Sequence, residues 1–286
     1  MATTSGNNSY KQSYSSQTVA TQQTRTAESE AAFLLPYIKK TDSILDVGCG
    51  PGTITCGLAK YASEGRTTGI DISANVLQRA RTAADNAKLL NEGPGSIWFE
   101  EGNILEGLAY PDNTFDVVFC AHTLGYMPPP DLPLKAITEM RRVLKPGGIL
   151  AVCDTVEQHF YPRSVGLELD RLWVGNFGRA VLKGYDGVDL SPAVMPALFR
   201  RAGFDVDGDK VRIGTGSSVF TGAETREWLA KRAESQLQPG DALYRSWREA
   251  GITDEEIQQA LQASKKWAET EDAWYAALQC QMLAWK

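Results

Sequence analysis

The chain has 286 residues, of which 43% are hydrophobic, and its formal net charge at pH 7 is −6. This length and composition allow a sizeable core and exclude a disordered protein. The acidic balance removes the non-specific attraction on which much nucleic-acid binding depends, so we expect no nucleic-acid partner. No apolar run reaches the ~18 residues of a membrane span and no secretory signal is present, so we expect a cytoplasmic protein without a membrane partner.

The N-terminal segment, residues 1–23, consists mainly of Ser, Thr, Asn, Gln and Gly. Such a composition buries too little apolar surface to offset the entropy of ordering the chain, so we expect a flexible tail. A helix is expected over residues 25–39, because their apolar side chains recur at helical spacing. This helix would lead into the first strand.

The most informative segment is residues 44–53, ILDVGCGPGT, which is followed by Asp71 at the end of TGID. It predicts a strand, a glycine turn, a helix at about 52–63 and a second strand at 66–71. In a doubly wound sheet such glycines let the backbone approach a nucleoside, and the carboxylate accepts hydrogen bonds from two ribose hydroxyls. A nicotinamide cofactor is disfavoured, because its third glycine would fall at Thr53.

Helices and strands continue to alternate up to about residue 155. The expected order is a helix at about 73–91, strands at 96–100 and 115–120, a helix at 131–144 and a strand at 148–153. This alternation predicts a parallel sheet with right-handed crossovers.

Beyond residue 155 the pattern becomes mainly helical. We expect helices over 161–183 and 191–202, two short strands within 204–220, and helices over 221–286. The last segment carries five tryptophans, which we expect to dock the helices on the sheet. The alternative is that Trp173, Phe177 or one of these tryptophans lines a pocket for an apolar or ring-shaped substrate.

Three further blocks complete a recognisable set. They are Gly102-Asn103-Ile104 after the third strand, FDVV at 115–118 in the fourth, and RVLKPGG at 142–148 before the fifth. With the glycine turn and Asp71 they cover about residues 25–155. As a set they resemble class I S-adenosylmethionine-dependent methyltransferases of the ubiquinone/menaquinone-biosynthesis type, in the small-molecule branch found in fungal secondary metabolism.

The resemblance implies a fold, an organisation and a cofactor. The fold would be α/β, a doubly wound, seven-stranded, mainly parallel Rossmann-like sheet with added N- and C-terminal helices. The cofactor would be S-adenosyl-L-methionine, with S-adenosyl-L-homocysteine as product and no metal. The organisation would be a tail at 1–23, a methyltransferase domain at 24–220 with a helical substrate-side insertion at 161–190, and a C-terminal helical extension at 221–286 packed on the same domain.

The resemblance also assigns cofactor contacts where residues match. The glycine turn should lie under the methionine and ribose, Asp71 at the ribose hydroxyls and Ile72 against the adenine. Asn103 stands where Asp is commoner, but its oxygen can still accept a hydrogen bond from the adenine amino group. Arg25 could pair with the cofactor carboxylate or be a solvated charge. The expected cofactor set is Tyr14, Arg25, Asp46, Gly48, Gly50, Gly52, Asp71, Ile72, Asn103, Ile104, Ala121 and His122.

Methyl transfer from a sulfonium is an in-line displacement, which needs alignment and desolvation rather than a metal. A thiol of pKa ~8.5 needs modest help to ionise, whereas an alcohol or phenol needs a base. We expect a small-molecule partner with a thiol acceptor, such as the dithiol of reduced gliotoxin, and a monomeric enzyme. The alternatives are O- or N-methylation and, in another class, a non-catalytic cofactor-binding regulator.

The two histidines, His122 and His159, follow predicted strands at the carboxyl edge of the sheet, where ligands bind. His122 is the catalytic candidate, with a structural histidine as the alternative. His159 joins Trp173 and Phe177 as a substrate-binding candidate. Cys49 is not expected to be a nucleophile, because methyl transfer to a small molecule needs no enzyme thiol. The five scattered cysteines suggest neither a disulfide framework nor a metal site.

Overall fold

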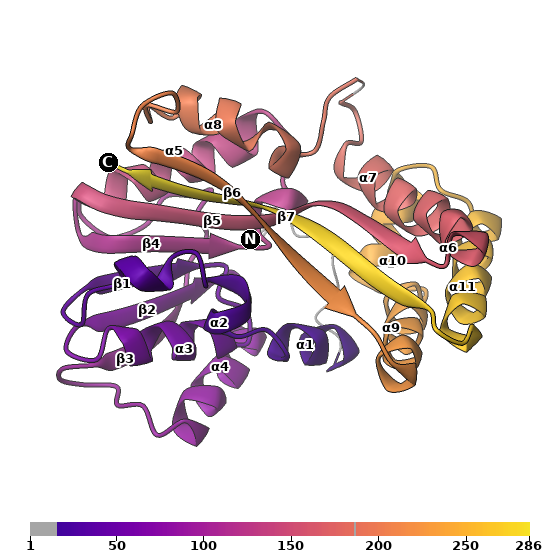
Figure 1. Ribbon diagram of the computed structural model, residues 1–286, viewed down its shortest axis with the longest axis horizontal. Coiled ribbons are helices and arrows are strands. Elements are labelled where there is room, and N and C mark those ends of the chain that lie inside the picture. The colour runs from indigo at the N-terminus through magenta and orange to yellow at the C-terminus, as the bar shows by residue number, and fades with distance from the viewer. Residues whose placement is uncertain (1–15, 186) are drawn as a thin grey trace, which may run out of the picture.

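A computed structural model describes residues 16–185 and 187–286 of the chain. One seven-stranded sheet runs through it in the order β3-β2-β1-β4-β5-β7-β6 (Figure 1). Only β7 runs antiparallel to its neighbours. The mainly parallel, seven-stranded fold expected from the sequence is therefore confirmed. The strands are β1 (Ser43–Val47), β2 (Arg66–Asp71), β3 (Ser96–Glu101), β4 (Phe115–Ala121), β5 (Leu144–Tyr161), β6 (Val211–Phe220) and β7 (Trp274–Trp285).

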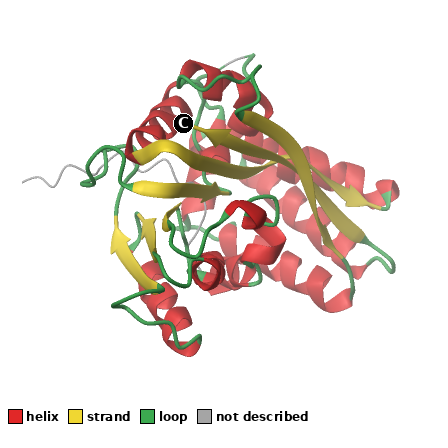
Figure 2. Cartoon of the chain, turned by 60° about the vertical axis from the view of Figure 1, so that its left-hand side comes forward, coloured by secondary structure: helices red, strands yellow, loops and turns green. Residues whose placement is uncertain are grey.

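Helices cover the sheet in two regions. One group surrounds the parallel strands, with α5 and α8 on one face and α2 and α3 on the other. The second group packs at the far ends of β5, β6 and β7, which reach beyond the other strands (Figure 1, Figure 2). The helices are α1 (Ser16–Gln23), α2 (Ala27–Glu30), α3 (Thr53–Tyr61), α4 (Ala74–Asn86), α5 (Asp131–Val143), α6 (Arg163–Leu169), α7 (Gly175–Val181), α8 (Met195–Arg201), α9 (Ala223–Gln236), α10 (Ala242–Glu249) and α11 (Asp254–Glu269).

Part of the expected N-terminal tail is folded. Residues 16–23 form α1, which packs against α9. Thr18 and Val19 on this helix are buried. The expectation of a flexible tail is wrong for these residues, because the surface that orders them comes from a helix 200 residues away in the sequence. Tyr14 lies outside the described residues.

The helix expected over residues 25–39 is broken into two short pieces. Thr26 caps α2 through a capping box with Ser29. A 3-10 turn, Leu35–Tyr37, follows. Pro36 stands inside this turn, where it lacks an N–H and disfavours the helical conformation of the residue before it. The single continuous helix is therefore wrong.

The C-terminal segment is not all helical. After α11 the chain enters β7, which inserts between β5 and β6. Residues 204–220 hold one strand, β6, in place of two. The C-terminal part of β7 is buried at three consecutive positions, Met282, Leu283 and Ala284, so the regular two-residue alternation by which a strand is recognised is lost there. This is why β7 has the appearance of a helix in the sequence.

Two features are absent from the described residues. None of the helices there combines the length and the apolar character of a membrane span. Residues 16–185 and 187–286 also contain no group of three or more His, Cys, Asp and Glu side chains placed to hold a metal ion.

Candidate active site

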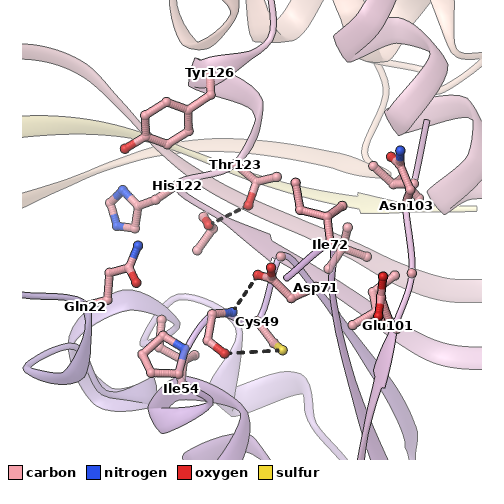
Figure 3. A pocket seen from close by; sticks show the side chains of 18 of the residues that line it. Gln22, Cys49, Ile54, Asp71, Ile72, Glu101, Asn103, His122, Thr123 and Tyr126 are labelled. Atoms are coloured by element: carbon pink, nitrogen blue, oxygen red, sulfur yellow. Dashed lines mark hydrogen bonds between the residues drawn. The ribbon is translucent and has the colours of Figure 1, made fainter. Parts of the chain in front are cut away.

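A cavity of about 590 Å³ opens at the carboxyl ends of β1, β2, β3 and β4. We call it the glycine-turn cavity, because residues 47–51, 53 and 54 form its floor. The loops after β2, β3 and β4 complete the wall. Its volume lies within the ~300–1,000 Å³ of small-molecule sites. Its position is where ligands bind in doubly wound sheets. Figure 3 shows His122 and Tyr126 at one end of this wall, Asn103 and Glu101 at the other, and Asp71 between them.

Two glycines of the turn expose its backbone to the cavity, because they have no side chain. Gly48 and Gly50 have φ angles of +74° and +53°, which strain other residues. A Cβ at Gly48 would also lie 2.3 Å from Thr123 Oγ1. Gly52 does not line the cavity, contrary to expectation, because it faces α4. A Cβ there would lie 2.7 Å from the Cβ of Ala80.

Asp46 lies beneath the turn, not in the wall of the cavity. Its side chain is 3% exposed and accepts a hydrogen bond from Thr55 Oγ1 at 2.6 Å. Burial raises its pKa to about 7. The expected cofactor contact is therefore replaced by a contact that joins β1 to the first turn of α3.

Asp71 connects the end of β2 to the glycine turn and lines the cavity. Its Oδ2 accepts a hydrogen bond from the Gly50 N–H, and its Oδ1 accepts one from the Ser73 N–H, both at 3.0 Å. Burial raises the pKa of Asp71, and these backbone donors oppose the rise. Each carboxylate oxygen retains lone pairs for a further donor, such as a ribose hydroxyl.

The loop after β3 closes the far end of the glycine-turn cavity. Ile72, Asn103 and Ile104, which are expected to contact the cofactor, line it. The Asn103 amide is already engaged, because its Oδ1 accepts a hydrogen bond from the Leu105 N–H and its Nδ2 donates to Glu106. Only the remaining lone pair of Oδ1 is available for the contact with an adenine amino group.

A second cavity of about 190 Å³ adjoins the first. Arg25, His122 and Tyr126 line both cavities. We call the second one the aromatic cavity, because rings from five helices and strands and from the adjoining turns surround it. These rings are Tyr126, Phe160, Trp173, Phe177, Phe220, Trp267 and Tyr275.

His159 lines neither cavity, contrary to expectation. The sequence predicts a loop after residue 153, but β5 continues to Tyr161, so neighbouring side chains point to opposite faces. Gln158 and Phe160 face the aromatic cavity. His159 is half-exposed, and its Nδ1 lies 2.9 Å from Asp170 Oδ2.

His122 follows β4 and has a left-handed backbone with φ +51°. Its Nε2 lies 2.7 Å from Glu30 Oε2, and the two side chains are only 9% and 5% exposed. Gln279 on β7 donates a hydrogen bond to the same Glu30 oxygen at 3.0 Å. Burial opposes ionisation of Glu30, but the hydrogen bond and charge of His122, the charge of Arg25 and the Gln279 hydrogen bond outweigh it and lower the Glu30 pKa.

Several lining residues were missed by the sequence reasoning. Thr123, Tyr126 and Met127 follow His122 in the loop after β4. Their position after the carboxyl end of a strand could have predicted that they line a ligand site. Gln22 and Glu30 had no such signal, since they precede the first strand. Only tertiary packing brings them to the cavities.

Comparisons with known proteins find relatives that are named methyltransferases. Residues 38–173 match the methyltransferase-domain family. The probable methyltransferase ltbC of Aspergillus luteorubrus is 79% identical over 100% of both chains. An uncharacterized methyltransferase of Schizosaccharomyces pombe is 33% identical over 72% of each chain. The 27-O-demethylrifamycin SV methyltransferase of Amycolatopsis mediterranei is 32% identical over 72% of this chain and 70% of its own.

Solved structures give the same fold at lower identity. The YcgJ protein of Bacillus subtilis matches with a TM-score of 0.53 and 16% identity, covering 89% of this chain and 97% of its own. The doubly wound sheet with a nucleoside-sized site defines a class of cofactor-binding enzymes. Within it, this chain belongs to the class I S-adenosylmethionine-dependent methyltransferases.

Proposed function

We propose that the protein transfers the methyl group of S-adenosyl-L-methionine to a small natural product held in the aromatic cavity. The observation that carries the proposal is the junction of the two cavities. Arg25, His122 and Tyr126 line both, so a ligand in one cavity would lie next to a ligand in the other at these residues. Such a junction supplies the close, dehydrated approach that an in-line displacement requires.

The order of residues along the glycine-turn cavity supports one orientation of the cofactor. Adenine would lie near Ile72 and Asn103, and the ribose at Asp71 (Figure 3). The methionine end would then lie at Gly48 and the residues that line the junction. When bound, the cofactor supplies an electrophilic methyl group on a sulfonium. The residues fit it, because the bare turn at Gly48 and the free lone pairs of Asp71 match a nucleoside.

Arg25 suits the carboxylate of the methionine moiety. Its guanidinium has no hydrogen-bond partner within residues 16–185 and 187–286, and it lines the junction. A guanidinium binds a carboxylate through paired N–H donors. Ala121 lines the glycine-turn cavity beside His122 and would border the same end of the cofactor.

The aromatic cavity favours an acceptor with an apolar body. Trp173 and Phe177 lie in its wall, and Phe177 packs edge-on against Tyr126 with ring centroids 5.6 Å apart. Polar groups face the same space, among them Glu30, Asp154 and Gln158. We therefore propose that a ring-bearing acceptor with a few polar substituents binds here.

Two acceptor atoms are candidates. The sequence also resembles gliotoxin bis-thiomethyltransferases, which methylate a dithiol, and this resemblance favours sulfur. The hydrogen-bonded contact between His122 and Glu30 at the junction favours oxygen, because a hydroxyl needs a base and a neutral histidine held by a carboxylate can act as one. The rifamycin relative carries an O-demethyl substrate in its name, in agreement with oxygen.

Calorimetry and a transfer assay together test the proposal. We expect S-adenosylhomocysteine to bind the purified protein and NAD not to bind. With methyl-labelled S-adenosylmethionine, we expect label to appear in at least one member of a panel of ring-bearing thiols, phenols, alcohols and amines. Binding without any transfer would favour the non-catalytic regulator, and binding of NAD alone would contradict the assigned cofactor.

A further inference from the structure

We propose that His122 is the general base for an acceptor hydroxyl and that Glu30 is the positioning residue that holds it for this task. This inference rests on the proposed function and narrows it to O-methylation. The geometry behind it is the buried contact between His122 Nε2 and Glu30 Oε2 at the junction of the two cavities.

The contact with Glu30 determines which ring nitrogen carries the proton. A carboxylate accepts a hydrogen bond only, so Nε2 of His122 must be the N–H donor. In the neutral ring Nδ1 then has a free lone pair. In the described part of the chain, no group forms a hydrogen bond with Nδ1. That nitrogen is the proton acceptor that the proposal requires.

Groups from three elements fix the dyad and its charge. Glu30 ends α2, Gln279 on β7 donates to it, and the backbone N–H of His122 donates to Cys153 O on β5 at 2.9 Å. The hydrogen bonds that His122 and Gln279 donate to Glu30 favour its ionised form, which stabilises an imidazolium. Two further charged groups act on the dyad. Arg25 acts on Glu30 through its charge, and the buried Asp154, whose pKa is raised by its own burial, interacts with the charge of His122.

The proposed step balances in atoms and charge. As the acceptor oxygen attacks the methyl carbon, the O–C bond forms, the S–C bond of the sulfonium breaks, and its electron pair stays on the sulfur as a thioether. The hydroxyl proton moves to Nδ1 of His122, which becomes an imidazolium paired with the Glu30 carboxylate. The proton passes to water after the product leaves, and the base is restored.

A thiol would use this arrangement poorly. A thiol with a pKa of ~8.5 is partly ionised near neutral pH, whereas a phenol at ~10 and an alcohol above it are not. A buried histidine oriented by a carboxylate therefore accelerates hydroxyl methylation much more than thiol methylation. The ratio of the rate of hydroxyl methylation to the rate of thiol methylation therefore measures the contribution of the base.

The tautomer can be measured without any acceptor, since the chain has only two histidines. In a long-range nitrogen–proton NMR spectrum at about pH 8, we expect the proton of the neutral His122 ring on Nε2. The His159→Gln variant assigns the signals and, because His159 lies outside both cavities, should leave turnover unchanged. A proton fixed on Nδ1, or a ring that stays doubly protonated at that pH, would overturn the proposal.

Turnover of matched probes tests the chemistry. We expect His122→Asn to slow methylation of 2-naphthol by about 100-fold or more, the usual contribution of a general base. Glu30→Gln should slow it by about 10-fold, and Glu30→Asp should restore part of the loss, as expected when a carboxylate orients the ring. Methylation of 2-naphthalenethiol should change by no more than about threefold, because the thiol ionises without the base.

Equal losses with both probes would contradict the base role. Failure of wild-type protein to methylate either probe, with S-adenosylhomocysteine still bound, would count against the proposed acceptor. In that case the NMR tautomer still decides on the dyad. Affinity for S-adenosylhomocysteine within about threefold of wild type shows that each variant is folded.

Discussion

At the scale of single residues, Asp71 fixes the backbone conformation of the glycine turn. Its two oxygens accept hydrogen bonds from the Gly50 and Ser73 N–H groups, so it fixes the glycine turn, and it also lines the glycine-turn cavity. We predict that Asp71→Ala raises the dissociation constant of S-adenosylhomocysteine tenfold or more, since hydrogen bonds to a charged group contribute ~1.5–3 kcal/mol each. Calorimetry measures it. Asp116→Asn, a control at the opposite end of the sheet, should bind normally.

Asp46 makes stability depend on pH. Its folded-state pKa of about 7 lies above the ordinary 3.8, so the folded protein holds the proton more tightly than the unfolded chain. The free energy of unfolding therefore falls as pH rises from about 4 to about 7, by up to ~4 kcal/mol. We predict that the fall in Tm between pH 5 and pH 8 is smaller in Asp46→Asn. An identical fall in both proteins would show that the carboxylate does not titrate in this range.

At the scale of elements, the helices and strands around the glycine turn were predictable. The bounds of β2, β3, β4 and α5 differ from expectation by no more than one residue at either end. Each carries its own signal, an apolar run or a helical period flanked by turn residues. The positions of Asp71, Ile72 and Asn103 at the ends of β2 and β3 were predictable for the same reason, because local sequence fixes where they lie relative to a strand.

The elements that the sequence did not predict correctly are ordered by segments that are distant in the sequence. α1 is ordered by α9, and β7 is a strand because β5 and β6 flank it. Glu30 is likewise placed at the site by residues that are distant in the sequence. Its partner Gln279 is 249 residues further along the chain, and no local pattern links them. Tertiary packing, which overrides local propensity, decided these cases.

Helix α1 lets us test whether such an element matters for the site. Gln22 on α1 lines the glycine-turn cavity, and Val19 is the buried apolar residue of the helix. We predict that Val19→Asp, which buries a charge, undocks α1 and weakens S-adenosylhomocysteine binding about threefold to tenfold. Gln23→Asp on the exposed side of the same helix is the matched control. Equal affinity in both variants would mean that α1 does not contribute to the wall.

At the scale of the whole molecule, the second half of the chain forms the aromatic cavity by docking on the long ends of β5 and β7. Trp267 is central to this docking, because it is 1% exposed, packs edge-on against Phe160 and donates an Nε1–H hydrogen bond to Tyr161 O at 2.9 Å. The sequence predicts that tryptophans dock the helices, and also that some line a pocket. Trp267 does both.

Removal of that side chain should loosen the helices. We predict that Trp267→Ala lowers the free energy of unfolding by ~3–5 kcal/mol, as for other large buried aromatic residues. Trp274→Ala should cost less, since Trp274 is 37% exposed. Denaturant unfolding measures both. Equal losses would show that the two tryptophans contribute alike.

The central claim is that the two cavities meet where the methyl group leaves the cofactor. A crystal structure with S-adenosylhomocysteine tests it most directly. The account predicts the adenine beside Asn103, the ribose hydroxyls on Asp71, and the sulfur at the junction lined by Arg25, His122 and Tyr126, facing the aromatic cavity. A sulfur at the Asn103 end, or one closed off from the aromatic cavity by the protein, would contradict it.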